Sequence, residues 1–352
     1  MEKRFLGRSG LEVSAFSFGV MTFGSGEGPF ASIGSTGADD AGRQVDIALE
    51  CGVTLFDTSD NYSQGLSEQM LSHALGDRRN HALIATKVFG RTGGGERDIG
   101  LSRKHITNAC EASLKRLGTD RIDLYQVHNF DSLVPMEETL RALDDLVRAG
   151  KVRYIGCSNH FAWQMTSALC LSERRGLAPY VSQQIQYSLL VRDAEMELLP
   201  AAVAHGAGSL IYSPLAQGYL SGKHRAGAQA NTRLGHSTRQ FHAFDGLRGR
   251  AIVETLIEIA TSRSVSASQV ALNWVRTRAG VTSVIIGARS EAQLLDNLAA
   301  ADWNLTEDEV QRLDSVSATP LTYPAIAQQI FHSERNPSLF PRARRKSDTD
   351  KA

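Results

Sequence analysis

Features that mark several other classes of protein are scarce or absent in this chain. Its 352 residues include four cysteines, which show neither a CxxC motif nor the Cys/His spacing of a metal site. No stretch approaches the roughly 18 uncharged apolar residues that would span a membrane. The 38 basic residues balance 38 acidic ones, so charge gives no case for binding nucleic acid or an anionic membrane. We therefore expect no metal cofactor, no nucleic-acid partner and no membrane partner.

The cysteines and the N-terminus indicate where such a protein works. Each cysteine lies in an apolar run, as buried free thiols in a reducing compartment do: Cys51, Cys110, Cys157 and Cys170. The N-terminal sequence MEKRFLGRSG lacks the apolar core of a signal peptide. A basic cluster at 342–346 adjoins serine, threonine and aspartate residues at the end of the chain, and we interpret it as a solvated tail. These features predict a cytoplasmic protein.

Short apolar segments alternate with segments of helical periodicity along the chain. The apolar segments are nearly continuous in hydrophobicity, as strands buried on both faces are. The predicted strands are Phe16–Phe23, Thr54–Thr58, Leu83–Phe89, Leu124–His128, Tyr154–Ser158, Ser182–Tyr187, Ser209–Ser213 and Thr282–Gly287. Apolar stripes at helical spacing lie between them, for example at Ile106, Cys110, Leu114 and Leu117, and at Met136, Leu140, Leu143 and Leu146. Eight alternating strand–helix repeats predict an α/β fold, a (β/α)₈ TIM barrel with a parallel sheet.

Two further elements lie outside the eight repeats. Lys3–Leu6 and Leu11–Ala15 flank a GRSG turn, which predicts an N-terminal β-hairpin before the first barrel strand. Thr306–Ser315 has the capping pattern of an extra C-terminal helix. We expect a single barrel domain over residues 1–320, followed by a C-terminal tail, 321–352, with a flexible end.

Three long segments are polar or rich in glycine: 24–38, 90–100 and 223–250. Each follows a predicted strand, so each belongs to the face where barrel active sites are built. Four phenylalanines in or beside these segments either line an apolar pocket or pack the loops down, and the sequence leaves both open: Phe30, Phe89, Phe241 and Phe244.

Charged and titratable residues stand where consecutive predicted strands end. Asp57, Lys87 and His128 follow the second, third and fourth strands. A buried charge needs a partner, so one such residue alone is typical of a satisfied structural group. Three that converge on the same mouth of a barrel indicate a catalytic site instead.

The residue types suggest proton transfer to a carbonyl. A carbonyl that accepts hydride needs a proton donor for its developing oxyanion. Tyr62 can donate, and a nearby Lys87 ammonium would lower its pKa from the unperturbed value of about 10. Asp57 would hold Lys87 in place and charged. His128 would orient the carbonyl oxygen through a hydrogen bond and share in proton delivery.

These residues resemble the catalytic tetrad of the aldo-keto reductases, which are (β/α)₈-barrel carbonyl reductases. Asp57, Tyr62, Lys87 and His128 match the tetrad in order and spacing. The similarity continues at Gly19–Gly24, at Glu68, at Leu117–Leu124, at Arg148–Asn159 and at Tyr212–Lys223, and it ends near Ser317. The resemblance implies reversible, NAD(P)H-dependent reduction of an aldehyde or ketone to an alcohol, with Tyr62 as the proton donor.

The same resemblance implies which residues hold NADPH. Ser158, Asn159 and Gln184 would bind the nicotinamide carboxamide, and Tyr212 would stack on its ring. Gln184 is chosen over Gln183, which would lie on the opposite side of the strand. The pyrophosphate would lie along the following stretch, with contacts from Ser213, Leu215, Gln217, Gly218, Ser221 and Lys223. An ordinary strand-to-loop turn is the alternative interpretation of Ser158 and Asn159.

A second cofactor segment lies near the C-terminus. Gly287 stands in a loop that leads into a helix, and such a helix N-terminus is an anion site. Arg289 supplies a fixed cation suited to the 2′-phosphate that distinguishes NADPH from NADH. By resemblance, Gln293 would approach the ribose phosphate and Asn297 the adenine. A solvent-facing Arg289 that caps the helix is the alternative.

Two positions depart from the family pattern, and one function of another class competes. Ser59 stands where the family often has alanine, and Ile286 replaces a common proline.

Some relatives of the family act as oligomeric auxiliary subunits that bind NADPH and sense redox state. The sequence keeps every residue that turnover needs, so we predict an enzyme with a small-molecule carbonyl substrate. The substrate depends on the loops rather than on the fold, and hydroxy-ketones, sugar-like carbonyls and polycyclic ketones all stay open; the oligomeric state is open too.

Overall fold

The computed structural model describes residues 1–25, 33–227, 229, 232, 234–235 and 238–335. Its contacts divide the chain into a compact unit, Met1–Ser317, and a second unit, Ala318–Ala352. The first unit holds every predicted site residue. It ends a little before residue 320, where the sequence placed the end of the barrel domain.

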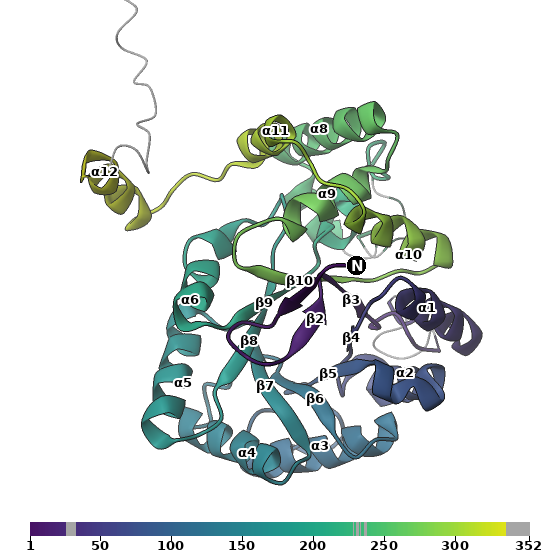
Figure 1. Cartoon of the computed structure of the whole chain (residues 1–352), viewed down its shortest axis with the longest axis vertical. Coiled ribbons are helices and arrows are strands. Elements are labelled where there is room, and N and C mark those ends of the chain that lie inside the picture. Colours follow the sequence, from purple (N-terminus) through teal and green to yellow (C-terminus); the bar gives the residue numbers. More distant parts are fainter. Residues whose placement is uncertain (26–32, 228, 230–231, 233, 236–237, 336–352) are drawn as a thin grey trace, which may run out of the picture. The chain divides into compact units, whose positions relative to one another are not determined.

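Eight parallel strands close into a barrel at the centre of the first unit (Figure 1). The strands are β3 (Phe16–Gly19), β4 (Leu55–Asp57), β5 (Leu83–Val88), β6 (Ile122–Val127), β7 (Val152–Ser158), β8 (Tyr180–Gln186), β9 (Gly208–Tyr212) and β10 (Val281–Ile286). Each pairs with its sequence neighbour, and β10 pairs with β3 to close the ring. The predicted TIM barrel is confirmed.

Among the strand boundaries that differ from the predicted ones, one differs because the chain turns and another because a charged residue lies inside the strand. β3 ends at Gly19, because the apolar run beyond it turns back at Val20, whose carbonyl accepts from the Phe23 backbone N–H at 3.0 Å. β6 begins at Ile122 and therefore includes Asp123. That carboxylate fits inside the wall because Arg79 lies 2.9 Å from it.

Helices surround the barrel and bury their apolar stripes against the strands (Figure 1). They are α1 (Ala38–Glu50), α2 (Leu66–Leu75), α3 (Arg103–Leu117), α4 (Met136–Arg148), α5 (Ala162–Arg175), α6 (Leu198–His205), α7 (Thr238–Phe244), α8 (Leu247–Arg263), α9 (Ala267–Arg276), α10 (Glu291–Leu298) and α11 (Glu307–Ser317). The predicted stripe of α3 is buried, with Ile106 and Cys110 fully inaccessible. None of the described helices combines the length and the apolar character needed to cross a lipid bilayer.

The predicted N-terminal hairpin closes the end of the barrel at which the strands begin. It consists of β1 (Lys3–Phe5) and β2 (Glu12–Ser14), paired antiparallel. Leu6 and Val13 from the hairpin are fully buried against inward-facing apolar side chains of the strands, such as Leu124. Because this end is plugged, the opposite end, where the strands finish, is the open mouth.

The loop predictions are corrected in part. Residues 223–250 are not one loop, because α7 and the start of α8 lie within them. Phe244 packs its ring 6.0 Å from that of Tyr219, and Phe89 packs against the core, so both hold loops down. Phe30 and the side chain of Phe241 lie outside the described residues.

The C-terminal helix predicted over Thr306–Ser315 is confirmed as α11. In the second unit, residues expected to form only a tail include another helix, α12 (Ala325–Arg335). The end expected to be flexible, from 336 onward, lies outside the described residues.

Candidate active site

The barrel mouth is organised around a buried ion pair between two neighbouring strands. Lys87 lies on β5 and is fully buried, and its Nζ donates to Asp57 Oδ1, at the end of β4, at 2.6 Å. The same ammonium donates to the Thr58 carbonyl oxygen at 2.7 Å. Burial would lower the pKa of Lys87, but the Asp57 carboxylate and Tyr62 together raise it above its ordinary value. Lys87 therefore carries a fixed positive charge inside the barrel.

Two glutamines complete the surroundings of this carboxylate. Gln184 Nε2 on β8 donates to Asp57 Oδ2 at 2.8 Å, and Gln126 Nε2 on β6 donates to the same oxygen at 3.3 Å. Gln183 faces the other way and donates to the Leu198 carbonyl oxygen in α6. The predicted opposition of the two neighbouring glutamines is therefore correct. Gln126 was not among the predicted residues, although its strand position, two before His128, places it on the inner face.

Tyr62 is held against the ion pair by an unusual turn. Lys87 Nζ lies 5.1 Å from the centre of the Tyr62 ring. After Tyr62 the chain passes through Ser63 and Gln64 with φ of 46° and 58°, which are left-handed values that cost side-chain-bearing residues energy. Ser63 partly compensates by donating its hydroxyl to the Phe23 carbonyl oxygen at 3.0 Å. The strain is local to the turn that aims the tyrosine.

A buried carboxylate fixes the far side of this turn. Glu68, at the start of α2, is fully buried, accepts from Thr86 Oγ1 at 2.6 Å and pairs with Arg116 Nε at 2.6 Å. Gly65 has φ 89°, and a Cβ there would lie 2.7 Å from the Arg116 side chain. Gly65 and Glu68 therefore anchor the Tyr62 turn and are bound away from the reacting atoms.

His128 follows β6 and faces Tyr62 across the mouth. The two rings lie edge to face, with centres 5.8 Å apart. Burial lowers the pKa of His128 to about 3, and the nearby Lys87 charge adds to the effect. The imidazole is therefore neutral at physiological pH. Its Nδ1 lies 3.3 Å from the hydroxyl of Ser59, the position that departs from the family pattern.

The structure draws attention to Asp60, which the sequence interpretation passed over. Its side chain is almost fully buried, and its Oδ1 lies 3.2 Å from Ser59 Oγ. Burial, with a smaller contribution from the nearby Glu68 carboxylate, raises the pKa of Asp60 to about 7. An acidic residue in the loop after a buried strand was the available signal, but its burial depends on how the fold brings α2, α3 and β6 around it.

The predicted nicotinamide residues lie together on one side of the mouth. Ser158 Oγ donates to the Gln184 carbonyl oxygen at 3.0 Å. Asn159 Nδ2 donates to the His128 carbonyl oxygen at 3.0 Å, and Asn159 Oδ1 accepts from the Tyr212 hydroxyl at 2.8 Å. Burial raises the pKa of Tyr212, and Tyr62 raises it further, so the two phenols are near each other. These residues are thus joined to the tetrad by hydrogen bonds.

The predicted pyrophosphate stretch forms a tight bend after β9. Ser213, Gln217 and Gly218 all have positive φ, at 53°, 57° and 93°. Ser221 Oγ donates to the Gly218 carbonyl oxygen at 2.8 Å, and Leu215 accepts from the Gly218 N–H at 2.9 Å. A Cβ on Gly218 would lie 2.9 Å from Lys223 Nζ. The bend therefore brings the Lys223 ammonium beside the Gly218 backbone, and a cation at this place suits an anionic group.

The predicted adenosine segment lies between β10 and α10. Ser290 caps α10 by accepting from the Gln293 N–H at 3.3 Å. Gln293 Oε1 accepts from the Arg289 N–H at 3.0 Å, and Asn297 Nδ2 is 3.4 Å from the Gly287 carbonyl oxygen. These contacts hold the loop at the helix N-terminus, where a phosphate is favoured.

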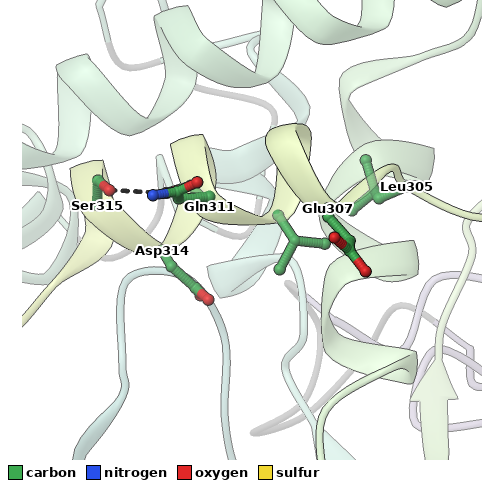
Figure 2. Close-up of a pocket in the computed structure, with 6 residues that line it drawn as sticks. Leu305, Glu307, Gln311, Asp314 and Ser315 are labelled. Carbon is green, nitrogen blue, oxygen red and sulfur yellow. Dashed lines mark hydrogen bonds between the residues drawn. The ribbon is translucent and has the colours of Figure 1, made fainter. Parts of the chain in front are cut away.

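A hollow elsewhere on the surface is separate from this site. It runs along α11 and is lined by Leu305, Glu307, Val310, Gln311, Asp314 and Ser315 (Figure 2). All of these come from one helix and the turn before it, and none comes from a strand end. Asp314 is already bound to Trp274 Nε1 at 3.0 Å and to Arg278. The hollow has no group placed for chemistry.

Comparisons with known proteins agree with this geometry. The sequence profile described as "Aldo/keto reductase family" matches residues 15–318. The chain is 36% identical over 331 residues to "Uncharacterized oxidoreductase YrpG" of Bacillus subtilis, covering 91% of this chain and 97% of that protein. It is 35% identical over 333 residues to "Putative voltage-gated potassium channel subunit beta" of Schizosaccharomyces pombe, covering 90% and 94%. It is 31% identical over 346 residues to "Versiconal hemiacetal acetate reductase" of Aspergillus parasiticus, covering 92% and 99%.

Proposed function

Because the chain belongs to the aldo-keto reductase family, we propose that it reduces an aldehyde or ketone to an alcohol with NADPH, reversibly, and that Tyr62 is the proton donor. The observation that carries the proposal is the buried Lys87–Asp57 pair, 2.6 Å apart, set against the Tyr62 ring. A fixed cation next to a phenol has little structural use, because an apolar pair would pack as well without the cost of burying charge.

The residues divide the work of proton transfer. Tyr62 gives its hydroxyl proton to the carbonyl oxygen and becomes a phenolate, which the Lys87 ammonium stabilises by charge. Asp57 keeps Lys87 protonated and oriented. His128 lies across the mouth and positions the carbonyl oxygen. A bound nicotinamide cofactor supplies the hydride.

The residues around the mouth fit such a cofactor. Lys223 beside Gly218 and Arg289 before α10 give two cations for a pyrophosphate and a 2′-phosphate. Ser158, Asn159 and Gln184 offer amide and hydroxyl groups near the tetrad for a carboxamide. Asn159 keeps a second N–H and a second lone pair beyond its two hydrogen bonds. The remaining contacts in this proposal are Tyr212, Ser213, Leu215, Gln217, Ser221, Gly287, Gln293 and Asn297.

We place the enzyme in the cytoplasm with a small-molecule carbonyl as its partner. All four cysteines are free in the structure. Cys110 and Cys157 are buried as expected, but Cys51 is half-buried and Cys170 is exposed, so the expectation that all four are buried is wrong. Free buried thiols are typical of a reducing compartment.

Replacing Tyr62 by phenylalanine tests the assignment of the acid. General acid catalysis is worth about 10²- to 10⁴-fold, so kcat for carbonyl reduction should fall by that factor while NADPH still binds. Tyr154→Phe serves as the control, because that ring packs beside the hairpin end of the barrel. Turnover of the Tyr62 variant within about tenfold of wild type would remove Tyr62 from this role.

A second candidate function rests on the relatives' names. Several relatives at 33–35% identity are named as beta subunits of voltage-gated potassium channels. A chain that serves as a cofactor-binding, redox-sensing subunit would bind NADPH and turn over very slowly. Multiple-turnover assays with a broad panel of ketones and aldehydes discriminate, because an enzyme releases oxidised cofactor and continues, whereas a sensor stops after one turnover.

A further inference from the structure

The hydroxyl of Ser59 lies among three hydrogen-bonding groups but carries one proton. Ser59 Oγ is 2.8 Å from Asn61 Oδ1, 3.2 Å from Asp60 Oδ1 and 3.3 Å from His128 Nδ1. Ser59 and Asp60 are almost fully buried, so water does not compete for these contacts. The direction of the Ser59 proton therefore determines what its neighbours must do.

The protonation of His128 is coupled to that direction. The imidazole is neutral, so one of its ring nitrogens carries a proton and the other is an acceptor. When Ser59 donates to a carboxylate or amide oxygen, its lone pair faces His128, and Nδ1 must carry the ring proton. When Ser59 donates to Nδ1, the ring proton must be on Nε2. Nδ1 is engaged by Ser59, so Nε2 is the nitrogen left for the reacting oxygen.

Asp60 lies behind Ser59 in a cluster that mixes charges. The groups that face it are Glu68 on α2, Arg116 on α3 and Tyr125 on β6, together with the backbone N–H of Asn61. Arg116 is bound to Glu68 and is not directed at Asp60. Within the described part of the chain, Asp60 Oδ2 and the Tyr125 hydroxyl oxygen are buried without a hydrogen-bond partner. An ionised Asp60 is poorly compensated there.

We propose that Asp60, Ser59 and His128 form a proton relay through which the ionisation of Asp60 sets whether His128 Nε2 donates a hydrogen bond to the substrate oxygen or accepts one from it. The proposal rests on the proposed carbonyl reduction, for which it supplies a further residue pair. Ser59 and Asp60 act through His128 and are positioning residues.

As the pH falls, the relay takes one proton from solvent at Nε2 and passes one proton onto Asp60. At the start Asp60 is ionised, Ser59 donates to it, His128 Nδ1–H donates to Ser59, and Nε2 is bare. When Nε2 takes a proton, Nδ1 gives its proton to Ser59 Oγ, and Ser59 gives its own to Asp60 Oδ1. His128 is neutral before and after, and Asp60 becomes a neutral carboxylic acid. Asn61 Oδ1 competes with Asp60 for the Ser59 hydroxyl proton only while Asp60 is ionised.

The two states suit opposite directions of the reaction. With Asp60 ionised, bare Nε2 can accept a hydrogen bond from an alcohol that is being oxidised. With Asp60 protonated, Nε2–H can donate to a carbonyl that is being reduced. Because the pKa of Asp60 is about 7, both the ionised and the protonated state are populated near neutral pH. Burial and the Lys87 charge keep the His128 ring from becoming a cation, and the Tyr62 ring faces it edge to face.

Nitrogen NMR of the cofactor-free protein with ¹⁵N-labelled histidine tests the relay directly. His128→Gln assigns the signals of this ring. Between about pH 5 and pH 8, wild-type Nε2 should change from protonated to bare while Nδ1 changes in the opposite sense. Asp60→Asn and Ser59→Ala should each abolish this exchange, and Ser59→Thr, which restores a hydroxyl, should recover it. Ser67→Ala is the control, because its buried hydroxyl bonds the Val20 carbonyl oxygen and does not touch His128.

Kinetics supply the second readout. Between pH 6 and pH 8 the protonated fraction of a group that titrates near 7 falls about tenfold and its ionised fraction rises about tenfold. The ratio of wild-type kcat for reduction to kcat for oxidation should therefore fall about a hundredfold. In Asp60→Asn the ratio should be flat with pH. The relay would be overturned if wild-type His128 kept one tautomer over the whole pH range. It would also be overturned if the tautomer change persisted in Ser59→Ala. A wild-type protein that shows the tautomer step but reduces no carbonyl would overturn the proposed function and leave the relay standing.

Discussion

Replacing Asp60 by asparagine changes the stability of the protein in a way that depends on pH. The folded protein holds the pKa of Asp60 at about 7, against 3.8 for an exposed aspartate, mainly because burial disfavours the charge. The folded state therefore binds a proton that the unfolded chain has already lost. The resulting stability is complete below 3.8 and is lost as the pH rises through about 7. Asparagine has the same shape and never ionises, so the stability of the Asp60→Asn protein lacks this dependence on pH.

The magnitude follows from the interval between the two pKa values. At about 1.4 kcal/mol per pH unit, the interval from 3.8 to about 7 corresponds to about 4 kcal/mol. Asp60→Asn should therefore exceed wild type in unfolding free energy by about 4 kcal/mol above pH 7, by about 2 kcal/mol at pH 5, and by almost nothing below pH 4.

Urea unfolding of the cofactor-free proteins across this pH range measures the difference. Asp123→Asn is the matched control, because Asp123 is equally buried but accepts from Arg79 at 2.9 Å and lies 3.4 Å from Arg153. Removing a paired buried charge costs about 3–5 kcal/mol, so the control should be less stable than wild type. A constant difference between wild type and Asp60→Asn at every pH would refute the reasoning, since Asp60 would then have the same pKa folded and unfolded.

Three further experiments probe the site and its supports. Lys87→Met should remove nearly all kcat, and adding Asp57→Asn should cost little more, because residues that act as a unit are non-additive; additive losses in kcat would separate their roles. Arg289→Ala should weaken NADPH by about 1.5–3 kcal/mol and leave NADH almost unchanged, in fluorescence titrations at two salt concentrations; equal weakening of both would make Arg289 a loop-shaping residue. Gly65→Ala should lower the melting temperature, because its left-handed backbone alone costs about 1–2 kcal/mol and its Cβ meets an α3 side chain at 2.7 Å. Gly94→Ala, which meets nothing within 4 Å, should leave the melting temperature unchanged.

The barrel could be predicted because its signals are local. Each strand is a short apolar run bounded by polar residues, and each helix carries a stripe at its own period, so neighbours in sequence suffice to recognise them. The errors occurred where local signals conflict with distant partners. The charge of Asp123 made the start of β6 look like a loop, because the sequence does not show that Arg79 pairs with it. The apolar run after Gly19 looks like a continuing strand, although the chain turns at Val20.

The tetrad was predictable for a related reason. In a parallel barrel every strand ends at the same mouth, so Asp57, Lys87 and His128 had to converge whatever their sequence separation. The sequence thus determined the fold, the mouth and the residues that face it. It gave no distances, and hence neither the ion pair of Lys87 nor the neutral state of His128.

Only the tertiary structure decided how the groups behind the tetrad interact. Asp60 and Ser59 look like ordinary loop residues in the sequence. Groups of the next helix, α2, and of α3 and β6, which lie farther along the chain, surround them in the fold. A pKa depends on what surrounds a group in space, through burial and through charges within a few ångströms. Residue order determines which groups reach the mouth, but the packing of distant elements determines which of them hold a proton.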